Sequence, residues 1–153
     1  MNKMFAGVQI GRKNIVTGVG IFILLGFGFG IPLTVNLFGG SLLTQDQYQV
    51  WKVVHGYGVF LGFINYFFGL TIDRLRLTEG QKELSSWAFV IAAVFGGAIR
   101  MILAILGALS TFGRYASLGE TIFISLGTLI FLFGQSQSLK AGLTGKLAGR
   151  NVG

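Results

Sequence analysis

Four long apolar stretches constrain the fold of this chain more than any other feature. They cover about residues 15–38, 53–72, 86–108 and 118–139. Each is long enough to cross a bilayer, because a membrane-spanning helix needs about 20 mostly apolar residues. Charged residues form only 11% of the 153-residue chain, which is too few to cover a water-soluble globule. The sequence therefore predicts one integral membrane domain over residues 1–153.

The composition of the stretches favours helices over strands. The chain contains 25 Gly, 15 Phe and one Pro. It lacks the alternating segments of about ten residues that build a membrane β-barrel. We therefore expect an all-α, four-helix bundle embedded in the lipid bilayer. The first stretch begins too late and continues too far for a short cleavable signal peptide, so we expect it to be retained.

The basic residues predict the topology of the spans. Only Lys52 and Arg114 flank the membrane at the two connections after the first and third spans. Because cytoplasmic segments carry an excess of Lys and Arg, both termini are expected in the cytoplasm, as in a protein of the bacterial cytoplasmic membrane. The net charge of +7 is then a topology signal and does not indicate nucleic-acid binding. The basic residues on the predicted cytoplasmic side are Lys3, Arg12, Lys13, Arg74, Arg76, Lys82, Lys140, Lys146 and Arg150.

The chain has no cysteine and a single histidine, His55. The lack of cysteine excludes disulfides, thiolate catalysis and cysteine-bound zinc or iron–sulfur sites within this chain. One histidine also provides too few ligands for a zinc site. A haem iron needs only one axial histidine and can keep its other face open. A general acid–base role of His55, with Tyr57, Asn65 or Glu120 as its partner, is the other chemistry that these residues allow.

His55 stands at the head of a stripe of small residues on the second span. At 100° per residue, His55, Gly58, Gly62, Asn65 and Gly69 fall within about 80° of the helix surface. One interpretation is close helix packing, the commonest use of glycines four residues apart. The other is a flat surface on which a planar cofactor lies beside His55, with Gly58 and Gly62 in contact with it. Both interpretations stay open, and smooth faces of this kind also suit a homo-oligomer.

Ionisable residues gather in the outer half of the predicted bundle. Arg100 is expected roughly 12 Å below the outer end of the third span, and Glu120 lies nearer the surface on the fourth. An ionisable residue inside a span usually marks a function or a charge pair. Arg100 could pair with Glu120 or, as a cofactor-binding residue, with an anionic group of a ligand such as a carboxylate. We therefore expect a site for a small lipophilic ligand in this half of the bundle, near His55.

A short motif provides a family resemblance. A glycine-rich end of the first span, here residues 26–40, leads through an external loop to Trp51-x-x-x-His55, with Gly56 next and Asn65 further along the helix. In this order of features, over about residues 15–140, the chain resembles the styrene oxide isomerase family of small four-span membrane enzymes. The resemblance implies haem b, held between the subunits of a trimer, with His55 as the iron ligand.

The resemblance also implies a reaction. In that family the ferric iron binds an epoxide oxygen as a Lewis acid, and a 1,2-hydride shift gives an aldehyde. Asn65 is carried over as a catalytic residue, and Tyr57 is added from the acid–base alternative. Arg100 stands in the third span, where the family carries an Asp and a Tyr. Two other functions therefore stay open: a non-enzymatic haem-binding or sensing protein, and a structural or lipophilic-ligand-binding subunit whose glycine faces only pack helices.

Overall fold

Helices make up almost all of the chain that the structure describes. The computed structural model describes the backbone of residues 9–150 and the side chains of residues 9–141. No strand occurs among these residues, which confirms the predicted all-α fold. The elements are, in order, the helix α1 (Arg12–Leu37), α2 (Gln45–Thr71), the 3-10 turn η1 (Ile72–Arg74), α3 (Glu79–Ala93), the π-helix η2 (Val94–Ile99), α4 (Arg100–Ile105) and α5 (Leu109–Arg150).

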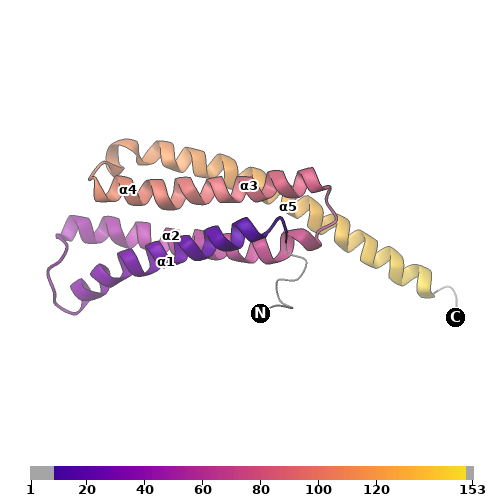
Figure 1. The fold of residues 1–153 in the computed structure, drawn as a ribbon, viewed down its shortest axis with the longest axis horizontal. Helices are drawn as coiled ribbons and strands as arrows, with labels where there is room; N and C mark the ends of the chain where they lie inside the picture. The colour runs from indigo at the N-terminus through magenta and orange to yellow at the C-terminus, as the bar shows by residue number, and fades with distance from the viewer. Residues whose placement is uncertain (1–8, 151–153) are drawn as a thin grey trace.

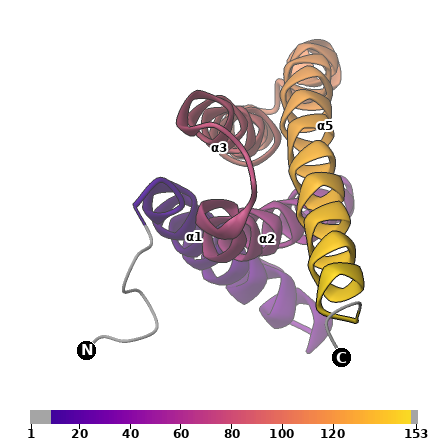
Figure 2. The same cartoon turned by 90° about the vertical axis from the view of Figure 1, so that its right-hand side faces the viewer.

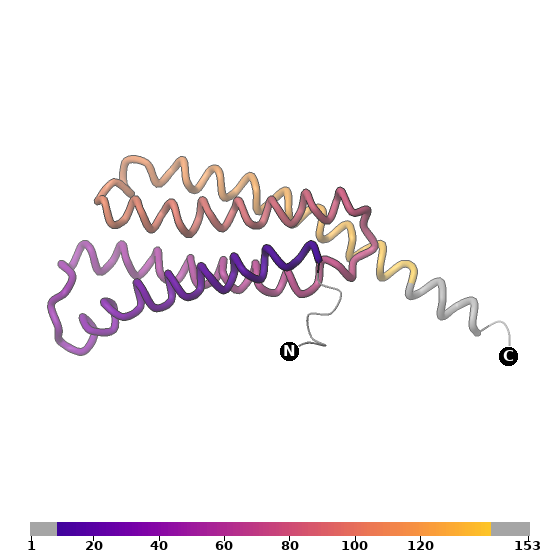
Figure 3. Tube along the Cα trace, viewed as in Figure 1, coloured from indigo at the N-terminus to yellow at the C-terminus, as the bar shows by residue number. Residues whose placement is uncertain are grey.

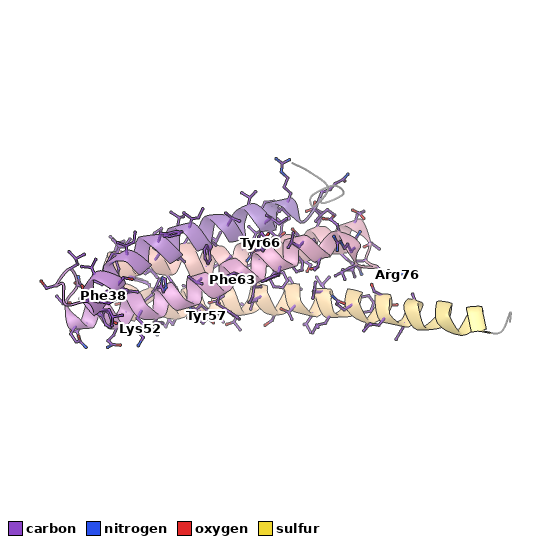
Figure 4. The ribbon with its side chains drawn as sticks, turned by 90° about the horizontal axis from the view of Figure 1, so that it is seen from below. Phe38, Lys52, Tyr57, Phe63, Tyr66 and Arg76 are labelled. Carbon is purple, nitrogen blue, oxygen red and sulfur yellow. The ribbon has the colours of Figure 1, made fainter. Side chains whose placement is uncertain are left out.

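The helices form two antiparallel pairs that lie side by side (Figure 1). α1 packs against α2, and α5 packs against the continuous span formed by α3, η2 and α4. The views in Figures 2 and 4 both place α2 between α1 and α5. The connections after α1 and α4 lie at one end of the bundle, and the connection after α2 lies at the other. α5 continues beyond the other helices at this second end (Figure 3).

Four helical segments of the described chain are long and apolar enough to cross a membrane. They are Arg12–Leu37, Gln45–Arg74, Glu79–Ile105 and Leu109–Ala141, which confirms four span-capable helices where the sequence predicted the spans. The helix α1 begins at the same end of the bundle at which α5 ends (Figure 1). That arrangement is the one expected for an even number of spans, whereas the cytoplasmic side stays a prediction from the basic residues.

Polar capping residues extend the helices beyond the apolar stretches. At the start of α2 the Thr44 hydroxyl accepts a hydrogen bond from the Gln47 amide (3.3 Å), and the Gln47 side chain accepts one from the Thr44 amide (3.0 Å). Thr78 and Gln81 form the same capping box before α3. Such boxes satisfy amides that have no partner inside the helix. Hydropathy marks only the apolar part of a helix, so the predicted starts at 53 and 86 were several residues late.

The first turn of α1 is fixed by a side chain from the connection after α2. The Asp73 carboxylate accepts hydrogen bonds from the backbone amides of Ile10 (3.1 Å) and Gly11 (3.0 Å). Gly11 itself lies against Gly69 of α2 so closely that an added Cβ would come within 1.9 Å of the Gly69 oxygen. These contacts hold α1 and α2 in one register, and that register decides which α1 residues face His55.

Candidate functional site

The His55 ring is held by the backbone of α1. Its Nδ1 lies 2.8 Å from the Leu25 carbonyl oxygen. A carbonyl only accepts hydrogen bonds, so Nδ1 carries the proton and donates it, and Nε2 keeps its lone pair when the ring is neutral. Histidines that bind metals usually donate their second ring N–H to a carbonyl or carboxylate in this way. The described geometry therefore leaves Nε2 of His55 as a metal-binding or proton-accepting nitrogen.

A groove on the surface of α1 and α2 adjoins the His55 ring. It has a volume of about 470 Å³, and its walls include Gly26, Gly30 and Thr34 of α1 and Tyr48 of α2. Volumes of 300–1,000 Å³ are typical of small-molecule sites. A Cβ added at Gly30 would lie only 3.1 Å from His55 Cε1, so the glycine lets the ring lie directly on α1. A Cβ at Gly26 would meet nothing closer than 3.9 Å, which leaves the groove open there.

These residues fit the donor set that haem requires. Among the described residues, no three His, Cys, Asp or Glu side chains gather to hold a bare metal ion. Haem brings four nitrogen ligands of its own and needs only an axial imidazole from the protein. His55 offers one nitrogen with its partner already fixed, beside a groove lined mainly by Gly, Phe, Leu, Ile and Val. The local arrangement is therefore compatible with an axial haem ligand.

The glycine stripe of α2 packs against α1. A Cβ added at Gly58 would lie 1.9 Å from Leu25 Cδ1, and one at Gly62 would lie 2.9 Å from the Gly18 oxygen. The helix-packing interpretation of the stripe is thus what the described contacts show. α1 covers the flat face that the sequence predicted at Gly58 and Gly62, because helical periodicity does not reveal which neighbour fills a face. Their contact with a cofactor stays a prediction, and the open space beside His55 is lined by Gly26 and Gly30 instead.

Arg100 lies in a charge cluster on the opposite side of α2. Its Nη2 is 2.9 Å from Glu120 Oε2 and donates a hydrogen bond to Ser117 Oγ at 2.7 Å. Its guanidinium carbon lies 4.5 Å from the centre of the Tyr57 ring, a cation–π contact. Figure 4 shows Tyr57 on the side of α2 that faces α5. Of the two partners that the sequence allowed for Arg100, the structure provides Glu120.

The charge cluster and His55 do not share one site. Tyr57 follows His55 by two residues, which turns it about 200° around the helix. Tyr57 and Arg100 therefore face α5, whereas His55 faces α1. The roles predicted for Tyr57 in catalysis and for Arg100 in cofactor binding stay predictions. Ser117 is a member of the cluster that the sequence reading missed, because a lone serine in a span carries no recognisable signal.

Gly96, within the π-helix η2, makes room for the Glu120 carboxylate. Glu120 is only 3% exposed, and a Cβ added at Gly96 of η2 would lie 2.6 Å from its carboxyl carbon. A larger residue at position 96 would therefore collide with the carboxylate in its present position. Glu120 Oε2 accepts no hydrogen bond of normal geometry from a described residue, so its contact with Arg100 is chiefly electrostatic. π-helical segments are rare and often occur near functional groups.

Asn65 belongs to a buried network that ties three helices together. Its amide nitrogen donates to the carbonyls of Leu61 and Phe89, both at 3.2 Å, and its oxygen accepts from Asn14 Nδ2 at 3.2 Å. Ser86 donates in turn to Asn14 Oδ1. Asn65 lies ten residues from His55, roughly 15 Å along α2. The structure therefore gives Asn65 an interhelical role away from the His55 groove, and its predicted catalytic role stays a prediction.

Comparison with known proteins adds no relative to these observations. No family model, no curated protein and no solved structure matches the chain. The resemblance to the styrene oxide isomerase family therefore rests on the Trp51–His55 motif and its surroundings. What the described residues establish is a helical bundle with four spans capable of crossing a membrane and a lone, oriented histidine beside a lipophilic groove.

Proposed function

We propose that this chain is an integral membrane protein that binds haem b through His55 and isomerises small hydrophobic epoxides. The observation that carries the proposal is the hydrogen bond from His55 Nδ1 to the Leu25 carbonyl, which leaves Nε2 free beside the groove. The motif resemblance supports the epoxide substrate. We place both termini in the cytoplasm and the chain in a homo-oligomer, with a trimer expected from the same resemblance.

The residues of the groove have separable roles in this proposal. His55 would bind the haem iron, the Leu25 carbonyl orients its ring, Gly30 lets that ring lie on α1, and Gly26 would leave space in the groove for the haem. Thr34 and Tyr48 are polar residues in the lining and are available to orient a substrate oxygen. Bound haem would supply a Lewis-acidic iron. A substrate of low polarity would reach the groove from the bilayer, because the surrounding wall residues are largely apolar.

The absorption spectrum of the purified protein tests haem binding. Protein made with ample haem and purified in detergent should show a Soret band, and His55→Ala should abolish it. Tyr57→Phe is the matched control, because Tyr57 lies on the opposite side of α2. A wild-type protein that stays colourless, or a Soret band that survives in His55→Ala, contradicts the proposal.

A pair of glycine substitutions tests the groove itself. Gly26→Leu should weaken haem binding at least tenfold, because Gly26 lines the groove and the new side chain has room to enter it. Gly28→Leu is the matched control, since Gly28 lies on the same helix with nothing within 4 Å of its Cβ position and does not line the groove. Equal affinities of the two variants for haem would place the ligand elsewhere.

The second candidate function is non-enzymatic haem binding. It is favoured because the third span lacks the Asp and Tyr that the resemblance to the enzyme family would require beside the site. The acidic residues of this span, Glu79 and Glu83, lie in the first turns of α3, far along the helix from Arg100. Arg100, the charged group deep in that span, is already paired with Glu120. Incubation with styrene oxide and aliphatic epoxides, followed by detection of aldehydes, separates the candidates. A haem-loaded protein that converts none of these substrates supports the second candidate.

A further inference from the structure

Leu25 connects the two helix pairs of the bundle at the level of His55. Its side chain is 1% exposed and belongs to a buried cluster with Phe29 and Val54. On one side it lies against Gly58 of α2, where an added Cβ would come within 1.9 Å of Leu25 Cδ1. On the other side it lies against Gly97 of η2, where an added Cβ would be 3.4 Å from the same atom. The Leu25 side chain is therefore a wedge between two glycines.

The carbonyl of the same residue holds the His55 ring. Its oxygen accepts the Nδ1–H bond at 2.8 Å, and residues 25 and 55 lie on different helices. This distance depends on how closely α1 and α2 approach, and the side chain of Leu25 lies at their contact. The Leu25 side chain thus helps to set the distance between α1 and α2, and the Leu25 carbonyl accepts the His55 hydrogen bond whose length depends on that distance.

We propose that Leu25 is a positioning residue for His55. The fit of its side chain between Gly58 and Gly97 fixes its carbonyl against Nδ1, and this holds the imidazole in the tautomer with a free Nε2 directed for ligation. The use of this contact for haem binding rests on the proposed function. The contact between the Leu25 carbonyl and His55 Nδ1 itself is present without a ligand. In this proposal Gly58, four residues before Gly62 in the stripe, does more than allow close helix packing. Its missing side chain leaves the space for Leu25 and so helps to hold the Leu25 carbonyl against His55.

The distances predict how far a single methyl group disturbs this arrangement. A Cβ at Gly58 would lie 2.9 Å from the Leu25 Cβ, which rotation of the side chain cannot move. Ordinary carbon–carbon contacts are about 3.5 Å or longer, so the helices must separate by roughly 0.6 Å. The Nδ1–oxygen distance would then approach about 3.4 Å, beyond the usual range of N–H···O hydrogen bonds. Gly58→Ala is therefore expected to release the His55 ring.

Nitrogen NMR of the ligand-free protein tests the proposal directly. His55 is the only histidine, so 15N-histidine labelling gives one pair of ring signals. The wild type should show a protonated Nδ1 that exchanges slowly with water and an unprotonated Nε2. Gly58→Ala should give a mixture of tautomers and faster proton exchange. Gly56→Ala is the matched control on the same helix, because nothing lies within 4 Å of that Cβ position, and it should match the wild type.

A second variant covers the case in which Gly58→Ala does not fold. Leu25→Ala removes the wedge without a clash and should also speed the exchange of the Nδ1 proton. Hemin titration provides the functional readout, and Gly58→Ala should raise the hemin dissociation constant about 10- to 100-fold relative to Gly56→Ala. A wild-type ring protonated on Nε2, or wild-type ring signals in both altered proteins, overturns the proposal. If the wild type binds no hemin, the proposed function fails, and the NMR comparison still decides the role of Leu25.

Discussion

Glu120→Gln isolates the energetic role of the charge pair within the membrane-spanning region. In the structure the Arg100 and Glu120 side chains are 14% and 4% exposed, and their charged atoms lie 2.9 Å apart. Glutamine keeps the shape of the side chain and removes its charge. Arg100 then remains in the bundle with the Ser117 hydroxyl and the Tyr57 ring as its polar contacts. The change should destabilise the folded protein because a buried cation loses its counter-ion.

The expected magnitude follows from the burial of the two groups. Removal of one partner from a buried ion pair typically costs about 3–5 kcal/mol. We expect the lower end, about 3 kcal/mol, because Arg100 keeps its hydrogen bond to Ser117 and has a partly exposed side chain. Such a loss lowers the folded-to-unfolded ratio on the order of 100-fold. Replacement of both Arg100 and Glu120 by methionine should restore most of this free energy, because two apolar side chains need no counter-charge.

Unfolding in mixed detergent micelles measures this difference. The protein is titrated with sodium dodecyl sulfate while the fluorescence of Trp51 and Trp87 is followed. Ser125→Ala, at an exposed position of α5, is the matched control and should unfold like the wild type. Unfolding of Glu120→Gln at the wild-type midpoint would contradict a stabilising role of the charge pair. A double methionine variant that is no more stable than Glu120→Gln would also contradict it, because the pair would then not be the source of the loss.

Two further predictions concern the packing of α1 against its neighbours. Asn65→Leu should lower the free energy of unfolding by about 1–3 kcal/mol in the same titration, because Asn14 loses an interhelical partner in a buried site; recovery in Asn14→Leu/Asn65→Leu would confirm the coupling. Gly18→Ala should impair folding much more than Gly20→Ala, because a Cβ at Gly18 would lie 2.6 Å from the Gly62 oxygen and one at Gly20 meets nothing within 4 Å. Equal stability of these two alanine variants would argue against the close α1–α2 contact.

Local sequence patterns were sufficient for the spans and for part of the charge cluster. Apolar length located all four spans, since this signal needs no knowledge of neighbouring helices. The depth estimate placed Arg100 and Glu120 in the same outer half of the bundle, and a lone charge in a span needs a partner, so their pairing was one of two expected outcomes. The helix ends were less accurate, because the capping residues Thr44 and Thr78 lie outside the apolar stretches.

The contents of the candidate site were harder to predict than its level in the bundle. The sequence placed His55 and Asn65 on one stripe, and the contacts show that this stripe meets α1. The sequence did not reveal that Asn65 would form a hydrogen bond with Asn14, or that His55 would form one with a backbone carbonyl. Nor did it reveal η2, because no simple pattern distinguishes six residues of π-helix from α-helix within an apolar run. The open groove beside His55 is lined mostly by α1 residues, whereas Gly58 and Gly62 of the predicted glycine surface do not line it.

Length, hydropathy and residue chemistry are local properties, so the sequence was enough to predict helices that are long and apolar enough to cross a membrane and to single out the lone His55 as the candidate ligand. The direction of the His55 ring and the separation of its groove from the Arg100–Glu120 pair could be seen only in the packed helices. Those features depend on the rotation and register of α1 against α2. Contacts between residues far apart in sequence, such as Leu25 with Gly58 and Gly18 with Gly62, set that rotation and register.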